Sequence, residues 1–268
     1  MTNYAWEAFM QSWLAESPAY LHHWIEEHGV DRASLSRVLD GLDIALRNEV
    51  LEHTSGGQEP NIFIPGLSEI AWWDNDRFPW IADLEAATEA ITAEFESLGG
   101  LTGKRTLSKP SELADEGRWS AHYLYYTAKA YPRNLRACPR TVKTLEPVPG
   151  ALGCGMTYFS VLDPGTHIAA HTGYTNAHLR CHLGLITPQG PRIRVGDDTR
   201  EWERGKAFVF DDSFEHEVWN DSTEGRAVLL FDIWHPELTD IEIRAIAYLM
   251  ETSRKLIYRS FWTKEFAS

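Results

Sequence analysis

Residues 178–187, HLRCHLGLIT, decide the fold. Side chains alternate between the two faces of a β-strand, so this segment, as a strand, has two unlike faces. One face is wholly apolar (Leu179, Cys181, Leu183 and Leu185), and the other carries three basic or polar groups (His178, Arg180 and His182). The apolar face belongs in a core. The polar face fits either a solvated sheet surface or the wall of an anion-binding site inside a barrel mouth.

The segments on both sides of this strand repeat its two-residue period. From about residue 119, further runs have the alternation and composition of strands: HYLYY (122–126), MTYFSVL (156–162), RIRV (192–195), KAFVF (206–210) and RAVLLFDIW (226–234). Turn-like segments separate them, namely DPG (163–165), PQG (188–190), GDD (196–198) and NDSTEG (220–225). Short strands joined by tight turns predict a mainly β fold with flanking helices, an antiparallel barrel or sandwich such as a jelly roll.

Helical patterns flank the predicted strands. Residues 1–55 are expected to form a helical N-terminal extension, with one apolar stripe at helical spacing made of Leu35, Val38, Leu39, Leu42, Ala45 and Leu46. The segment SGGQEP (55–60) predicts a boundary, which leaves 56–268 as the β-rich domain. A second helix is predicted over 82–98, and the capping-box pair Thr239 and Glu242 predicts a terminal helix near 240–259.

Composition narrows the class of protein. The 268 residues carry a net charge of −14, which disfavours nucleic acid and anionic membrane surfaces as partners. No run of about 18 apolar residues occurs, and the N-terminus lacks the pattern of a secretory signal. Three cysteines are too few for a disulfide framework and are expected to be buried free thiols (Cys138, Cys154 and Cys181). These features predict a cytoplasmic protein.

Four residues around the central strand suggest metal and anion binding. His171 ends the preceding strand, and His216 follows it by 45 residues. Imidazole is the commonest ligand for iron, zinc and copper, although a single histidine in a strand is more often structural. Arg226 follows His216 by ten residues, at the start of the next strand, where its guanidinium can hold the far carboxylate of a chelating dicarboxylate. Ser160 can add a hydroxyl hydrogen bond.

Three longer blocks carry a family resemblance. PGTHIAAHTGYTNAHLRCHLGL (164–185), EWERGKAFVFDDSFEHEVWND (201–221) and FDIWHPEL (231–238) resemble the aspartyl/asparaginyl β-hydroxylase family over roughly residues 119–238. The resemblance implies a double-stranded β-helix, or jelly-roll, core. It also implies Fe(II) as the metal, 2-oxoglutarate as cosubstrate and O2 as oxidant.

The resemblance makes His171 and His216 the two iron ligands. Related oxygenases use two histidines and one carboxylate, and the carboxylate position here is Gly173, as in the resembled family. A glycine leaves room for water or another small ligand on the iron. Because chloride is one such ligand, a halogenase is an alternative to a hydroxylase. A non-catalytic jelly-roll binding or sensor module is a third reading, which the presence of His171, His216 and Arg226 argues against.

The same resemblance assigns the cosubstrate site. Arg226 and Ser160 would bind the distal carboxylate of 2-oxoglutarate, whereas Arg180 and His182 would line its proximal end. Trp119 matches a cosubstrate-contacting tryptophan. These roles are expectations that rest on the resemblance.

The substrate residues depart from the family pattern. The animal enzymes have Lys at the position of Tyr158 and Arg at that of His178, and both hold an acidic substrate side chain there. Tyr174 adds bulk beside the first ligand, while Arg180 is retained and could hold one carboxylate. The sequence therefore predicts oxidation of a C–H bond, at the β-carbon, of an amino acid that is free, in a short peptide or bound to a carrier protein, rather than in a folded growth-factor-like domain.

Overall fold

Strand β8 (His178–Ile186) lies inside the larger of two antiparallel sheets in the computed structural model, which describes residues 3–54, 57–103, 106–107, 113–126 and 129–257. The apolar face of β8 packs in the main core, and all four of its predicted apolar residues are fully buried there. His178, Arg180 and His182 are at most 8% exposed. The opposite face of β8 is therefore interior, and a solvated outer surface is excluded.

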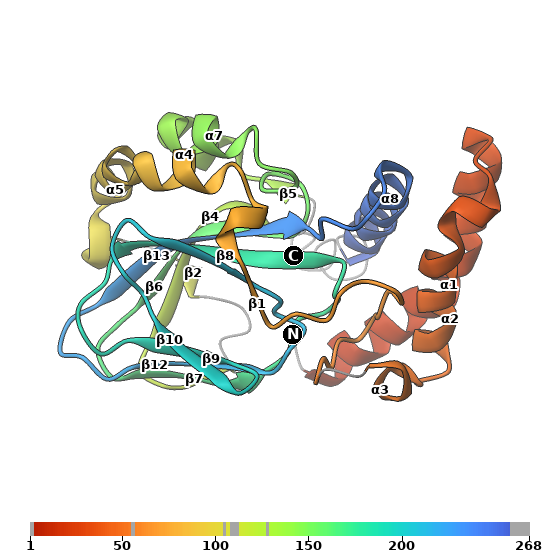
Figure 1. Ribbon diagram of the computed structural model, residues 1–268, viewed down its shortest axis with the longest axis horizontal. Coiled ribbons are helices and arrows are strands. Elements are labelled where there is room, and N and C mark those ends of the chain that lie inside the picture. The colour runs from red at the N-terminus through yellow and green to blue at the C-terminus, as the bar shows by residue number, and fades with distance from the viewer. Residues whose placement is uncertain (1–2, 55–56, 104–105, 108–112, 127–128, 258–268) are drawn as a thin grey trace, which may run out of the picture.

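The two sheets face each other as the layers of a jelly roll, which confirms the predicted fold class (Figure 1). The larger sheet runs in the order β1 (Trp72–Trp73), β11 (Ala207–Phe210), β8, β13 (Arg226–Trp234), β6 (Met156–Leu162), β4 (Trp119–Tyr126) and β2 (Thr106–Leu107), with β5 (Lys129–Ala130) paired to β4. The smaller sheet runs in the order β10 (Asp198–Glu201), β9 (Arg192–Val195), β12 (His216–Asn220), β7 (Thr166–His171) and β3 (Ala114–Glu116). Side chains between the sheets form a second core.

Short helices cover the outer face of the larger sheet: α4 (Ile81–Ala86), α5 (Thr88–Ser97), α6 (Pro132–Ala137) and α7 (Pro139–Leu145) (Figure 1). The single helix predicted over 82–98 is wrong, because the chain forms α4 and α5 with a break at Ala87. The Thr88 hydroxyl donates to the carbonyl oxygen of Glu85 at 2.6 Å, a local bond of the kind that competes with a regular helix.

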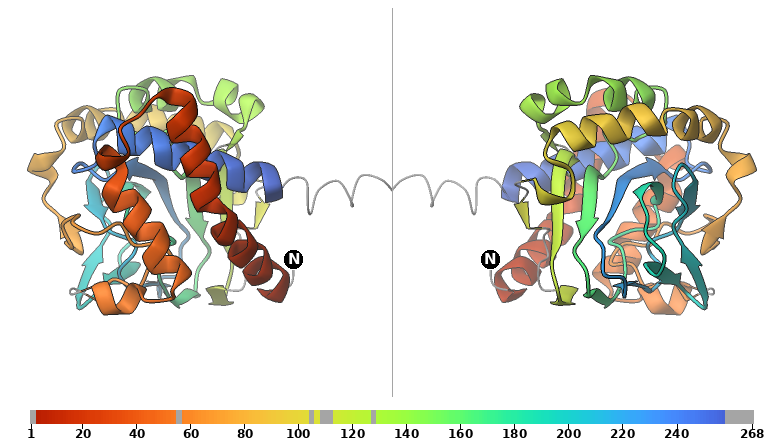
Figure 2. Two further views of the ribbon diagram at one scale, coloured as in Figure 1. Left: turned by 90° about the vertical axis from the view of Figure 1, so that its right-hand side faces the viewer. Right: turned by 90° about the vertical axis from the view of Figure 1, so that its left-hand side faces the viewer.

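A helical layer closes one end of the barrel. It consists of α1 (Asn3–His28), α2 (Ser36–Leu46), α3 (Val50–His53) and the terminal helix α8 (Asp240–Ile257), which share a core of their own (Figure 2). Arg37 on α2 donates to Glu242 on α8, which ties the two helices together. Glu242 also accepts from the backbone nitrogen and hydroxyl of Thr239, so the predicted capping box is confirmed. The predicted boundary residues 55–56 and the end of the predicted terminal helix at 258–259 lie outside the described residues.

The apolar stripe predicted on α2 is largely buried, but Leu46 at its end is 41% exposed. The helix packs closely on residues 61–64, since a Cβ at Gly41 would lie 2.5 Å from the carbonyl oxygen of Phe63. The three cysteines are buried free thiols, as predicted. In the part of the chain that the structure describes, no helix is long and apolar enough to cross a membrane.

Candidate functional site

Two histidines meet at one end of the smaller sheet. His171 ends β7 and His216 begins β12, and the two residues are paired in register across these antiparallel strands. Their ring centroids are 4.1 Å apart and their planes are inclined by 51°. His216 is only 3% exposed. Strand pairing therefore brings together the two residues that the sequence predicted as metal ligands.

Each ring is held in the form that a metal ligand needs. Nδ1 of His171 lies 2.8 Å from the carbonyl oxygen of Ala169, and Nδ1 of His216 lies 3.0 Å from that of Phe214. A carbonyl oxygen only accepts, so Nδ1 carries the proton and the lone pair of a neutral ring is at Nε2. Burial lowers the pKa of both histidines, which favours the neutral ring. The pair fits a divalent metal bound through Nε2.

The described residues provide no third metal ligand, because no group of three or more His, Cys, Asp or Glu could hold one ion. Gly173 occupies the sequence position of the carboxylate ligand. The space beside Gly173 is filled by Asp212, which lies in the connection between β11 and β12. A Cβ at Gly173 would lie 2.5 Å from Cγ of Asp212, whose carboxylate is buried. Two imidazoles without a protein carboxylate leave the remaining metal positions to non-protein ligands.

We expect Gly173→Ala to lower the free energy of unfolding by about 1–3 kcal/mol, because the added methyl overpacks against the buried Asp212 carboxylate. Urea unfolding measures the change. Gly153→Ala is the matched control, since a Cβ at Gly153 meets nothing within 4 Å and its φ is not in the left-handed region. Equal stability of the two variants would contradict the close packing of Asp212 on Gly173.

Arg180 lies between two buried carboxylates. Its NH1 is 2.9 Å from Oδ2 of Asp212, and its Nε is 2.9 Å from Oδ1 of Asp232. Burial alone would lower the pKa of Arg180, but the two carboxylates outweigh it and raise the pKa. Nδ1 of His178 lies 3.7 Å from the other oxygen of Asp212. The charge of Arg180 is thus already balanced within the protein.

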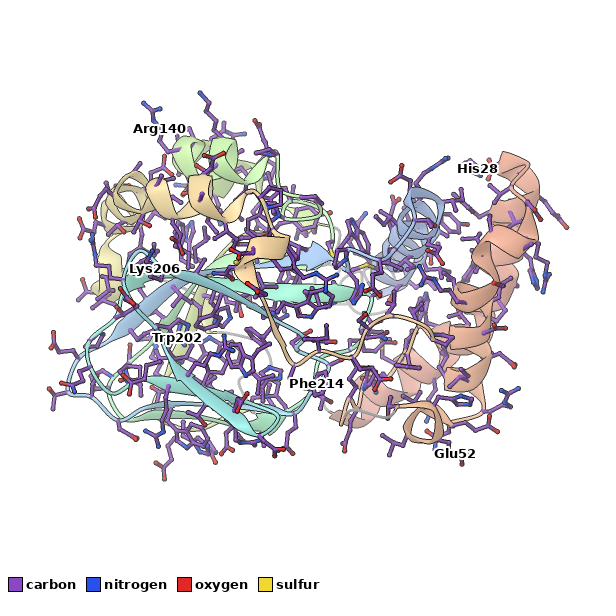
Figure 3. The ribbon with its side chains drawn as sticks, viewed as in Figure 1. His28, Glu52, Arg140, Trp202, Lys206 and Phe214 are labelled. Atoms are coloured by element: carbon purple, nitrogen blue, oxygen red, sulfur yellow. The ribbon has the colours of Figure 1, made fainter. Side chains whose placement is uncertain are left out.

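Arg226 is also a buried cation but, unlike Arg180, it is not paired with a carboxylate of any described residue. It is 1% exposed, and within the described residues it has no ion-pair partner and its Nε has no hydrogen-bond partner. Its NH1 lies 3.3 Å from Oγ of Ser160, and its guanidinium stacks 4.3 Å from the ring centre of Trp202, which lies between the two sheets (Figure 3). Burial lowers the pKa of Arg226 to about 9. A buried, unpaired cation of this kind calls for an anionic ligand.

The predicted cosubstrate residues share one cavity of about 30 Å³, namely Trp119, Ser160, Arg180, His182 and Arg226, together with both histidines of the pair. Ser160 Oγ accepts hydrogen bonds from Trp119 Nε1 at 3.1 Å and from Arg226 NH1 at 3.3 Å, and neither of these bonds uses the hydroxyl proton of Ser160. The cavity has room for about one water. The unpaired charge of Arg226 fits one carboxylate of a dicarboxylate ligand.

The predicted substrate residues line a second, larger cavity of about 400 Å³: Tyr158, Tyr174, His178 and Arg180. It adjoins the first, because both cavities are lined by Trp119, Tyr158, His171 and Arg180. Sequence reasoning missed Trp202, Asp212 and Asp232. Asp211 caps its turn by accepting from Ser213, whereas Asp212 pairs with Arg180. The alternation of RAVLLFDIW places Asp232 on the inner face, and that signal could have revealed it.

The chain is similar in sequence to known proteins. The profile of the family described as aspartyl/asparaginyl beta-hydroxylase matches residues 85–236. The chain is 35% identical over 189 residues to human aspartyl/asparaginyl beta-hydroxylase, covering 68% of this chain and 25% of that protein. It is 34% identical over 180 residues to an ornithine lipid ester-linked acyl 2-hydroxylase of Rhizobium tropici, covering 61% of this chain and 60% of that protein. The chain thus spans about a quarter of the human relative.

Among solved structures, a Pseudomonas putida prolyl-4-hydroxylase superposes with a TM-score of 0.40 at 16% identity. The superposition covers 62% of this chain and 93% of that one.

Proposed function

This chain belongs to the aspartyl/asparaginyl β-hydroxylase family, and on that basis we propose that it is an Fe(II)- and 2-oxoglutarate-dependent hydroxylase of an amino-acid substrate. The observation that carries the proposal is the combination of the neutral His171–His216 pair with the unpaired cation of Arg226 in one cavity. The histidine pair can bind a metal, and Arg226 can bind a carboxylate of a dicarboxylate.

His171 and His216 would hold the iron through Nε2. The iron and the 2-oxo acid, when bound, supply the oxidation in which one atom of O2 enters a C–H bond as a hydroxyl and the other enters succinate, with release of CO2. Arg226 and Ser160 would bind the distal carboxylate of 2-oxoglutarate. His182 would stay neutral beside it, because burial and the charge of Arg226 lower the pKa of His182. The tight aromatic packing of Trp202 with His182 and Phe208 would exclude water.

The structure disfavours halogenation as an alternative. A halide in such an enzyme takes the metal position that the missing carboxylate leaves open, next to Gly173. Here the buried carboxylate of Asp212 fills the space beside Gly173, and an anion repels a halide.

Family membership leaves the substrate open, since one relative is named for aspartyl and asparaginyl residues and another for the acyl chain of an ornithine lipid. We propose a free, peptide-linked or carrier-bound amino acid. The balanced charge of Arg180 supports this choice over an acidic side chain in a folded domain.

The test is an assay of the full chain with Fe(II), 2-oxoglutarate and air against a panel of free, peptide-linked and carrier-bound amino acids, with a growth-factor-like peptide as competitor. We expect succinate and a product heavier by one oxygen atom. A chlorinated product would favour the halogenase, and absence of succinate with every substrate would favour the binding module. Faster turnover of the folded peptide would overturn the proposed substrate class.

A further inference from the structure

One tryptophan contacts two of the groups that line the small cavity of about 30 Å³. Trp202 follows β10 and lies between the two sheets (Figure 3). Its indole Nε1 donates to Nδ1 of His182 at 3.2 Å, and the guanidinium of Arg226 lies over its ring, 4.3 Å from the ring centre. Trp202 is not among the residues that line this cavity. Any effect of Trp202 on a ligand there therefore passes through the two side chains that it holds.

The hydrogen bond from Trp202 determines which nitrogen of His182 carries the proton. An indole N–H group can only donate, so Nδ1 of His182 accepts and the proton of the neutral ring is on Nε2. A ring protonated at both nitrogens would direct a second N–H group at the indole N–H. Nε2 points away from Trp202, is buried, and has no hydrogen-bond partner within the described part of the chain. His182 is therefore a neutral donor whose partner would come from a ligand.

The same indole holds the second donor, Arg226. A guanidinium over an aromatic ring is held by cation–π attraction, which is stronger in a desolvated site. Stacking uses a face of the guanidinium and leaves its N–H groups, which lie in its plane, free to donate. Nε of Arg226 is buried and has no hydrogen-bond partner among the described residues. One side chain thus sets the tautomer of His182 and the plane of the Arg226 guanidinium.

The backbone that carries Trp202 is bound directly to the strand that carries His182. The amide nitrogen of Gly184, two residues after His182 on β8, donates to the carbonyl oxygen of Lys206 at 3.0 Å. A Cβ at Gly184 would lie 2.3 Å from the carbonyl oxygen of Glu203, the residue that follows Trp202. A side chain at this position would push the connection between β10 and β11 away from β8. The glycine therefore permits the close approach that the hydrogen bond to His182 needs.

From these contacts we propose that Trp202 is a positioning residue for the cosubstrate, which holds His182 as its Nε2–H tautomer and orients Arg226, so that both donate to a dicarboxylate in the small cavity. The proposal rests on the proposed function, since 2-oxoglutarate is the dicarboxylate that this function requires. The tautomer is a property of the ligand-free chain, and it can be measured without metal or cosubstrate.

Nuclear magnetic resonance of the full chain, isotope-labelled at the histidine nitrogens, measures the tautomer, because protonated and bare ring nitrogens differ widely in chemical shift. We expect His182, assigned by the signals that disappear in His182→Gln, to show a protonated Nε2 and a bare Nδ1. In Trp202→Phe, which keeps an aromatic ring but lacks the N–H group, the two shifts should move toward each other as both tautomers become populated. A protonated Nδ1 of His182 in the wild type would overturn the proposal, whether or not the variant folds.

Calorimetric titration of 2-oxoglutarate without oxygen, into the full chain loaded with Fe(II), measures the effect on the ligand. We expect Trp202→Phe to weaken 2-oxoglutarate binding by about 2-fold to 10-fold, the effect of one lost hydrogen bond, with Fe(II) binding unchanged. In a His182→Leu background the same substitution should have a smaller effect, because the hydrogen bond is already absent. An effect of equal size in both backgrounds would show that Trp202 does not act through His182.

Trp219→Phe is the matched control. Trp219 also contacts an arginine and a histidine, because its ring centre lies 4.8 Å from the guanidinium of Arg192 and 5.6 Å from the ring centre of His167. The two ring nitrogens of His167 lie 2.8 Å and 2.7 Å from the carboxylates of Asp115 and Glu217, so neither depends on the indole. The control should keep the wild-type shifts and the wild-type affinity for 2-oxoglutarate.

Wild-type shifts of His182 together with wild-type affinity in Trp202→Phe would overturn the proposal. The expected tautomer and its change in Trp202→Phe, in a chain that binds no 2-oxoglutarate, would support the hold of Trp202 on His182 and refute the proposed function. Succinate and a hydroxylated product in air, with unchanged shifts in Trp202→Phe, would support the proposed function and refute the role of Trp202.

Discussion

Arg226→Met is expected to weaken 2-oxoglutarate binding by about 2–5 kcal/mol, or roughly 30-fold to several thousandfold, while metal binding is retained. The substitution removes the one buried cation of the small cavity that has no ion-pair partner among the described residues. The same change should raise the thermal stability of the ligand-free chain, because a buried unpaired charge is replaced by an apolar side chain of similar length. A residue that was only structural would not give these opposite effects.

Anaerobic calorimetry with Fe(II) measures the affinity, and thermal unfolding without ligands measures the stability. Arg192→Met is the matched control, because Arg192 also stacks on a tryptophan, 4.8 Å from the ring centre of Trp219, but on the outside of the smaller sheet. The control should bind 2-oxoglutarate as the wild type does. Wild-type affinity in Arg226→Met would show that Arg226 does not hold the cosubstrate.

His216→Ala is expected to abolish stoichiometric iron binding. The proposed iron site has two imidazole ligands, and no group of three His, Cys, Asp or Glu among the described residues could hold an ion, so the loss of His216 would leave a single imidazole. The fall in affinity should exceed the ~10–100-fold that follows the loss of groups that merely orient a ligand. Metal analysis after anaerobic reconstitution with Fe(II) gives the stoichiometry.

His235→Ala is the control for this variant. His235 is also buried, and burial lowers its pKa to about 4, but it packs on Trp73 and lines neither cavity. The control should keep one iron per chain even if its stability falls. Full iron content in His216→Ala would mean that the metal binds elsewhere.

The β core could be predicted from the sequence because apolar and polar residues alternate along each strand, and this alternation indicates which face is buried. In β8 the apolar residues at every second position assign one face to the core, and the other face follows by geometry. The break between α4 and α5 could not be predicted in this way, since the apolar spacing continues through Ala87 while the Thr88 hydroxyl bonds back to Glu85. The apolar periodicity does not record this hydrogen bond.

Sequence motifs indicated the histidine pair. The contacts between side chains from distant segments could not be predicted. His171 and His216 are 45 residues apart in sequence but paired in register, as their strands require. That Arg180 could hold a substrate carboxylate stays a prediction. No local pattern indicated that Asp212 and Asp232, from two separate segments, both pair with Arg180. The helices of the N-terminal extension were predicted, but their position along the cavity depends on contacts with α8 that no local pattern records.

The most direct test of the hydroxylase is a reaction under isotopically labelled O2 with Fe(II), 2-oxoglutarate and a turned-over substrate, followed by mass spectrometry of both products. We expect one labelled oxygen atom to enter succinate and one to enter the new hydroxyl group, in equal amounts, and neither product to form in His216→Ala. Labelled succinate without a hydroxylated product would leave the hydroxylation unsupported. Equal activity in wild type and His216→Ala would show that His216 does not hold the catalytic metal.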